Sequence, residues 1–141
     1  MKKLVYFALL LCSLSLLTAC TGGAGGTGGA AAGANDETAQ LKDPKVGDLY
    51  AAELSELAEF EVPGGKAFGL LKVINVAPDT VTVVTDSSAW DDAISAKREL
   101  HGDLKQVVWD GEDEIVLARS QLLEMHRKEV IFGVRRGASN N

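Results

Sequence analysis

The sequence KAFGLLKVINVAPDTVTVVT, residues 66–85, consists of two apolar runs joined by a short turn signal. Residues 66–76 form the first run. Residues 80–85 form the second, in which apolar side chains recur with the period of two that is typical of a β-strand. Between the runs, Pro78 fixes its own φ angle for a turn, and Asp79 can close that turn with a side-chain hydrogen bond. The stretch therefore predicts an antiparallel hairpin.

The segment before the hairpin predicts a first strand at residues 46–52. Its continuation AAELSELAEF, residues 51–60, fits one or two helical turns equally well. Pro63 and the two glycines that follow it predict a turn or loop before the hairpin begins.

A helix is predicted over residues 89–100. Ser88 is a residue type that caps helix N-termini, Asp91 would lie near the positive end of the helix dipole, and Gly102 fits the C-terminal cap. Four residues follow the helical spacing i, i+3, i+4, i+7 and predict the buried face of this helix: Trp90, Ala93, Ile94 and Lys97. A binding role for the tryptophan is the alternative.

The rest of the chain predicts a second hairpin over residues 104–118 with its tip at residues 110–114. A short helix at residues 121–129, capped by Ser120, and a final strand at residues 130–136 complete the pattern. Together these elements predict an α+β domain, in which a small antiparallel sheet carries one longer and one shorter helix and can curl into an open barrel.

Three motifs, VGDLY, FGLLKV and DTVTVV, resemble the opening of the small SH3-like β-barrels of some bacterial immunity proteins. The resemblance covers the first strand and the hairpin and implies a barrel-like fold, whereas the helix at residues 89–100 is an insertion relative to such a barrel. Gly69 and Gly133 each follow a phenylalanine inside a strand-like run. They predict bulges or barrel corners, and a ligand approaching the backbone is the alternative interpretation.

The N-terminus has the features of a secretory signal peptide. Lys2 and Lys3 precede an apolar run at residues 4–17, which is shorter than the roughly 20 residues that a membrane-spanning helix needs. The residues Leu17-Thr18-Ala19-Cys20 resemble the lipobox of bacterial lipoprotein precursors. This resemblance implies cleavage between Ala19 and Cys20 and acyl chains on Cys20. Cleavage would also remove Cys12, the other cysteine of the chain.

Four segments are predicted from this pattern: a signal peptide at residues 1–19, a lipidated cysteine with a flexible linker at 20–38, a head domain at 39–137 and a disordered tail at 138–141. The linker is rich in glycine and alanine, which bury too little apolar surface to order a chain. Two or three acyl chains make a stable anchor, so the head would hang from a membrane surface.

The charge balance limits the classes of partner. The chain has 20 acidic and 14 basic residues, and removing Lys2 and Lys3 leaves 12 basic ones. An acidic head argues against nucleic acid and against electrostatic docking on anionic lipid. The basic pairs Arg127-Lys128 and Arg135-Arg136 would form a small patch if the last helix and strand are neighbours, and this patch would either meet an acidic partner or balance the acidic face of the fold.

The sequence predicts no cofactor, no metal site and no catalytic residue. The processed head lacks a thiol, and no Walker A loop, nucleophile elbow or zinc-protease helix motif occurs in the chain. The acidic run at residues 110–114 is a hairpin tip rather than a calcium loop, because the glycine and the final glutamate are wrongly placed for an EF-hand. A hydrolase or small-ligand carrier would need at least two of four side chains to meet in one pocket: Asp48, Asp86, His101 and His126.

The resulting hypothesis is a non-enzymatic, lipid-anchored envelope protein whose head binds another protein. In a Gram-negative cell, Thr21 after the lipidated cysteine is typical of outer-membrane sorting with the head in the periplasm; in a Gram-positive cell the anchor would face outward. The first alternative is an immunity lipoprotein that neutralises a toxin acting in the periplasm. The second is the hydrolase or small-ligand carrier.

Overall fold

The computed structural model describes residues 29–57 and 65–137, which form an α+β domain built on one antiparallel sheet. The strands of the sheet are β1 (Leu49–Glu53), β2 (Phe68–Val76), β3 (Thr80–Asp86), β4 (Trp109–Ala118) and β5 (Ile131–Arg135). The α-helices are α1 (Gly29–Lys42), α2 (Ala93–Leu100) and α3 (Arg119–Arg127), and two short 3₁₀ helices are η1 (Leu54–Glu56) and η2 (Leu104–Gln106). The predicted α+β class is therefore confirmed.

The strands are ordered β4-β3-β2-β1-β5, and every neighbouring pair is antiparallel. β1 lies between the hairpin and the last strand, so it brings the two ends of the domain together. Within the described residues β4 and β5 are the two edges of the sheet, so the sheet is open there. The SH3-like barrel is not confirmed.

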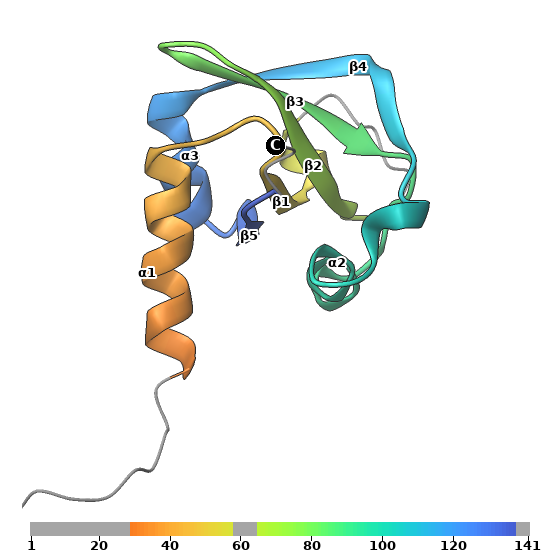
Figure 1. The fold of residues 1–141 in the computed structure, drawn as a ribbon. Coiled ribbons are helices and arrows are strands. Elements are labelled where there is room, and N and C mark those ends of the chain that lie inside the picture. Colours follow the sequence, from red (N-terminus) through yellow and green to blue (C-terminus); the bar gives the residue numbers. More distant parts are fainter. Residues whose placement is uncertain (1–28, 58–64, 138–141) are drawn as a thin grey trace, which may run out of the picture.

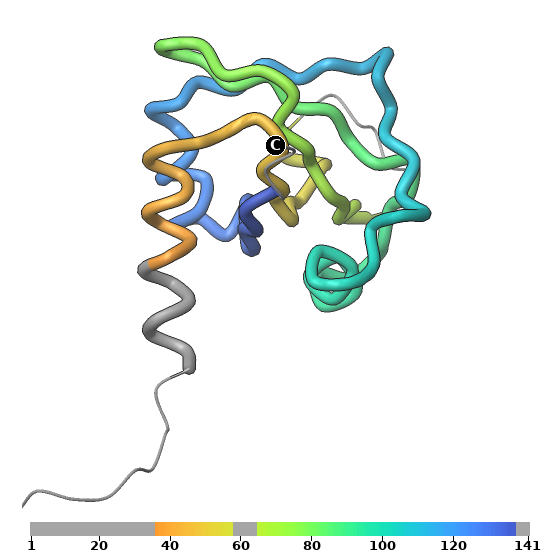
Figure 2. The backbone as a smooth tube through the Cα atoms, viewed as in Figure 1, coloured from red at the N-terminus to blue at the C-terminus, as the bar shows by residue number. Residues whose placement is uncertain are grey.

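The helices cover opposite faces of the sheet. In Figure 1, α1 and α3 lie side by side on one face, and α2 lies on the other. Figure 2 shows how the chain passes from one face of the sheet to the other: β4 carries the backbone from the α2 side to the α3 side. Two apolar clusters result, and neighbouring residues of β1 divide between them: Tyr50 belongs to the cluster beneath α1 and α3, and Leu49 to the cluster beneath α2.

The predicted hairpin is confirmed. β2 and β3 pair in register from Leu71 opposite Thr85 to Val76 opposite Val81, with a bulge between Val73 and Asn75. The backbone N–H of Ala77 donates to the Thr80 carbonyl at 2.9 Å and closes the turn. The first strand is confirmed as β1, starting three residues later than predicted. In the ambiguous segment that follows, residues 54–56 form the 3₁₀ turn η1, whereas residues 58–60 and the Pro63 of the predicted loop lie outside the described residues.

The predicted second hairpin is wrong. Residues 109–118 form the single strand β4, and residues 111–114 of the acidic run lie exposed along it rather than at a turn. The chain does not reverse at residues 110–114, because Trp109 before the run and Glu114 at its end both pair with the same neighbouring strand, β3. Leu104, expected to start a strand, begins η2, whose first turn is capped by the Asp103 carboxylate.

The helix expected over residues 89–100 begins later, at Ala93. Trp90 is held extended by two backbone hydrogen bonds with Phe68, of 2.8 and 2.9 Å, so the chain cannot enter the helix until Asp92, which replaces Ser88 as the N-cap. The hydroxyl and the N–H of Ser95 lower the pKa of Asp92. Only part of the predicted buried stripe is confirmed. Trp90 is partly buried and packs against the apolar cluster beneath α2, as predicted, but Ile94 is 79% exposed, and the helix buries Ala96 and Leu100 instead.

Two helix starts in the remaining chain differ from expectation. α1 begins at Gly29, within the segment 20–38 predicted to be a flexible linker, and so the linker prediction is corrected from residue 29 onward. Its sequence contains several alanines, the best helix formers, and its last turns dock through buried Leu41. α3 begins at Arg119 after an Ala118 cap, so Ser120 lies inside the helix and is not its cap.

The predicted signal peptide, Ala19, Cys20 and the tail at residues 138–141 lie outside the described residues, so the processing and lipidation predictions stay predictions. Among the helices of residues 29–57 and 65–137, none has the length and apolar character needed to cross a bilayer.

Candidate functional site

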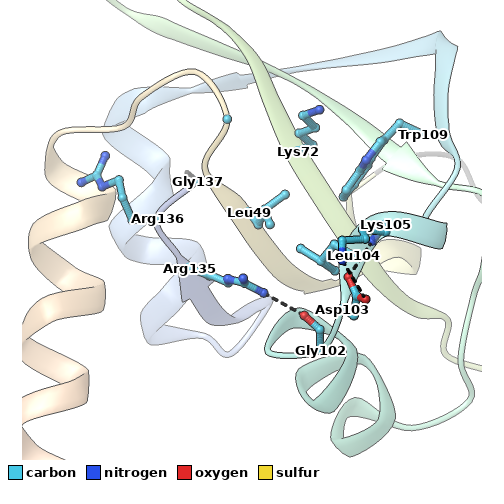
Figure 3. A pocket seen from close by; sticks show the side chains of 11 residues that line it. Leu49, Lys72, Gly102, Asp103, Leu104, Lys105, Trp109, Arg135, Arg136 and Gly137 are labelled. Carbon is cyan, nitrogen blue, oxygen red and sulfur yellow. Dashed lines mark hydrogen bonds and ion pairs between the residues drawn. The ribbon is translucent and has the colours of Figure 1, made fainter. Parts of the chain in front are cut away.

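A groove of about 750 Å³ opens on the α2 side of the sheet, where β1, β2 and β5 face the chain segment between α2 and β4. Figure 3 shows Leu49 at its centre, with Lys72 and Arg135 on either side of it and Trp109 beyond Lys72. Its volume is within the range of small-ligand pockets. Its complete lining is Gly47, Leu49, Lys72, Gly102, Asp103, Leu104, Lys105, Trp109, Arg135, Arg136 and Gly137.

Strand register fixes the floor of this groove. Leu49 on β1 lies opposite Lys72 on β2 and also opposite Arg135 on β5. Directly opposed residues of neighbouring strands point to the same face of a sheet. One apolar residue therefore lies between two cationic ones on three adjacent strands.

The Arg135 guanidinium is fixed by the C-terminal end of α2. Its Nη1 donates to the backbone carbonyl of Leu100 at 2.8 Å and to that of Gly102 at 3.2 Å. A cation at this position is favourable because helix C-termini carry partial negative charge. Both acceptors are neutral carbonyls, so the arginine is positioned while its full charge is retained.

Lys72 contacts the aromatic wall of the groove. Its Nζ lies 5.5 Å from the centroid of the Trp109 ring, a cation–π geometry worth about 0.5–1 kcal/mol at a site of this kind. Lys105 and Asp103 also line the groove, and they form a loose pair at 3.7 Å with both side chains exposed, which contributes little.

The adjacent Arg136 has a structural role. Its Nη1 lies 2.9 Å from Oδ2 of Asp48, whose side chain is completely buried, and in Figure 3 Arg136 points away from Arg135 towards α1. Asp48 also accepts from the backbone N–H of Lys45 at 2.8 Å. Gly47, with φ of +95°, turns the chain so that this carboxylate faces inward. The Val-Gly-Asp motif is thus explained by a buried ion pair.

The remaining sequence-predicted candidates lie in separate surroundings. Asp86 is buried at the end of β3, His101 is exposed after α2, and His126 lies on α3 with its Nδ1 2.9 Å from the Ile131 carbonyl. The Nε2 of His126 is 3.9 Å from the Glu37 carboxylate of α1. The geometry required of a hydrolase or carrier, two of the four candidates in one pocket, is not met in the pockets described for this structure.

Asp86 is the most perturbed carboxyl group with a described environment. Its Oδ1 accepts the Leu70 N–H at 3.1 Å, whereas Oδ2 is buried without a hydrogen-bond partner among the described residues. Burial raises the pKa of Asp86 to about 6, and the Glu99 charge adds to that effect. It lines a pocket of about 240 Å³ that also contains Asp110 and Asp113. Among the described residues, however, no three histidine, cysteine or acidic side chains are placed to hold a metal ion.

The predicted basic patch is not formed by the two basic pairs. Arg127 and Lys128 both pair with Glu124 on α3, at 2.6 and 3.7 Å, while Arg135 joins the groove on the other side of the sheet. The sequence interpretation missed Lys72 and Trp109. The signal that could have found the site was Lys72 itself, a lone charge in the apolar run FGLLKVINV.

The glycines singled out in the sequence permit close packing. A Cβ on Gly133 would lie 2.9 Å from Leu100 of α2, and the β1–β5 register shifts beside it, between Ala51 and Ala52. A Cβ on Gly69 would lie 2.7 Å from Leu54. The predicted bulge is therefore found near Gly133, where α2 approaches the sheet above the groove. Comparison of the chain with protein-family models, curated proteins and solved structures found no match.

Proposed function

We propose that this chain is a lipid-anchored protein of a bacterial cell envelope and that its head binds another protein through the groove around Leu49. The lipobox resemblance ending at Cys20 supports the anchor. The observation that carries the binding role is the concentration of cationic side chains and a tryptophan around an apolar floor, in a chain whose net charge is −6. Tryptophan and arginine are the residues most enriched at binding hot spots.

The docking of α1 suits an anchored head. α1 contacts α3 and β5, and Glu37 of α1 accepts the Val134 N–H at 3.2 Å. These contacts lie on the opposite face of the sheet from the groove. The side of the domain joined to the anchor is therefore separate from the side proposed to bind, and a membrane-attached head would keep its groove accessible.

Chemical cross-linking in cells tests the proposal. The full-length protein, carrying a C-terminal affinity tag, is cross-linked in its native host, and its adducts are identified by mass spectrometry. We expect the wild-type chain in the membrane fraction with a stoichiometric protein adduct, and loss of membrane association in Cys20→Ser. A chain that stays soluble without processing, or one that yields no specific protein adduct, would refute the corresponding half of the proposal.

An immunity lipoprotein is the second candidate, favoured by the acidic surface of β4. Asp110 is half-buried, and Glu112, Asp113 and Glu114 are exposed along this strand, at one edge of the sheet. Such a surface complements a cationic toxin. This candidate predicts that the cross-linked adduct is a secreted toxin. Replacing Glu112 and Asp113 by their amides should then weaken the capture of that toxin.

A further inference from the structure

We propose that the occupant of the groove is an acidic segment of the partner protein, with two carboxylates bound to Lys72 and Arg135 and an apolar side chain placed over Leu49. This inference rests on the proposed function and specifies the chemistry of its partner. Three properties of the groove carry it: the charge that it leaves uncompensated, the spacing of its cations, and the apolar surface between them.

Two cations of the groove lack a counter-ion within the described residues. Of the other cations that line the groove, Arg136 forms an ion pair with Asp48, and Lys105 forms one with Asp103. Lys72 and Arg135 have no carboxylate within ion-pair distance in the same part of the chain. The groove therefore presents two positive charges for which the described fold supplies no anion.

Both cations are also preorganised. Arg135 is held by two carbonyls at the end of α2, and Lys72 is half-buried beside Trp109. When a carboxylate binds them, these two side chains lose less conformational freedom than an exposed lysine would, and less water is displaced from them. Charge-assisted hydrogen bonds to such groups are stronger than those between neutral groups.

The spacing of the two cations fits an extended segment. Lys72 and Arg135 lie two strands apart, and adjacent strands are about 4.8 Å apart, so their backbones are about 10 Å apart. An extended chain advances about 3.3 Å per residue, and only every second side chain points to the same face. Positions i and i+4 of an extended segment are therefore about 13 Å apart on one face. Carboxylates there can reach two cations whose backbones are about 10 Å apart, while the side chain at i+2 lies over Leu49.

The apolar surface of the groove favours a protein segment over other anions as its ligand. Leu49 on the floor and Leu104 and Trp109 on the walls form apolar surface that phosphates and lipid head groups would leave uncovered. A long polyanion would also be repelled by the net charge of −6. An acidic segment with an apolar residue satisfies both the cations and the apolar surface, and it presents only a short run of negative charge.

Selection from a random peptide library tests the inference and requires no identified partner. The full-length protein in detergent micelles is the bait, empty micelles serve for counter-selection, and selected peptides are measured by fluorescence anisotropy. We expect enrichment of two acidic residues four positions apart with an apolar residue midway between them. Replacing both acidic residues by their amides should weaken binding at least about tenfold.

Variants of the protein locate the site. Lys72→Gln and Arg135→Gln should each weaken the selected peptides about fivefold or more, and Lys72→Arg should restore most of the affinity. Lys97→Gln on the exposed surface of α2 makes the same charge change outside the groove and should bind like the wild type. Because Arg135 also contacts α2, its variant is checked by circular dichroism, and Lys72→Gln is decisive if Arg135→Gln is misfolded.

Three results would overturn the inference: no peptides selected or none enriched in acidic residues, equal binding to wild type and Lys72→Gln, or binding to anionic vesicles through Lys72 and Arg135 while acidic peptides do not bind. The proposed function fails separately. If cells yield a protein adduct that Lys72→Gln also captures, the chain binds a protein elsewhere, and only the acidic-segment inference is wrong.

Discussion

Replacing Asp86 by asparagine should change the stability of the protein more favourably at neutral pH than at pH 4. This carboxyl is 6% exposed, one of its oxygens has no partner among the described residues, and burial raises its pKa from 3.8 to about 6. A shift of about 2 units corresponds to about 3 kcal/mol, the upper limit of the free energy needed to keep Asp86 ionised in the fold. Asparagine retains an oxygen for the Leu70 N–H and never carries the charge.

The sign of the pH dependence follows from linkage. The folded-state pKa of Asp86 lies above its unfolded value, so its contribution to stability is complete below about pH 4 and is lost as the pH rises through about 6. The unpartnered amide of the variant costs about 1–3 kcal/mol at either pH. We therefore expect Asp86→Asn to gain up to about 3 kcal/mol relative to the wild type between pH 4 and pH 7.5.

Urea unfolding followed by tryptophan fluorescence at the two pH values measures this difference. Comparing the same two proteins at both pH values cancels the packing cost of the substitution, which does not depend on pH. Asp91→Asn, an exposed carboxyl in the following loop, should show no such gain. An equal difference between Asp86→Asn and the wild type at both pH values would refute the reasoning, because it would place the Asp86 pKa near its ordinary value in the folded state.

Two further substitutions test the contacts that hold the chain ends. Arg136→Gln should lower the free energy of unfolding by about 2 kcal/mol, because buried Asp48 loses its charged partner. Urea titration should show no such loss for the exposed Arg98→Gln, and an equal loss in the two variants would contradict the assignment. Glu37→Ala should lower stability by about 1 kcal/mol and speed amide hydrogen exchange in the last turns of α1, because the Val134 N–H loses its acceptor; unchanged exchange would show that α1 docks without this contact.

The hairpin of β2 and β3 was predictable because its signals are local. The period of two and the turn at Pro78 act over a few residues, and long-range contacts reinforce rather than oppose them. The start of α2 was not predictable for the opposite reason. Ser88 and Asp92 are both good N-caps, and the choice between them is made by Phe68, about twenty residues upstream, which holds Trp90 extended.

The acidic run in β4 shows a similar limit. Gly111 beside several carboxylates resembles a turn, but strand pairing of Glu114 with Val84 on one side and Trp109 with Asp86 on the other draws the run into a single strand. Strand propensity depends strongly on such tertiary context. The groove was even harder to predict from the sequence, because Leu49, Lys72 and Arg135 become neighbours only through the register of β1 with both β2 and β5.

The adjacent arginines at the end of β5 illustrate why composition alone could not assign a site. The sequence presents them as one basic pair, but successive residues of an extended chain point in opposite directions. Arg136 forms an ion pair with buried Asp48, whereas Arg135 donates hydrogen bonds to carbonyls and keeps its charge in the groove. The same residue type therefore performs two separable tasks: loss of Arg136 should appear mainly as lost stability, and loss of Arg135 mainly as lost binding. Their separation depends on the start of β1, where Asp48 directly precedes Leu49, the first residue of the strand; Asp48 serves the ion pair and Leu49 the groove.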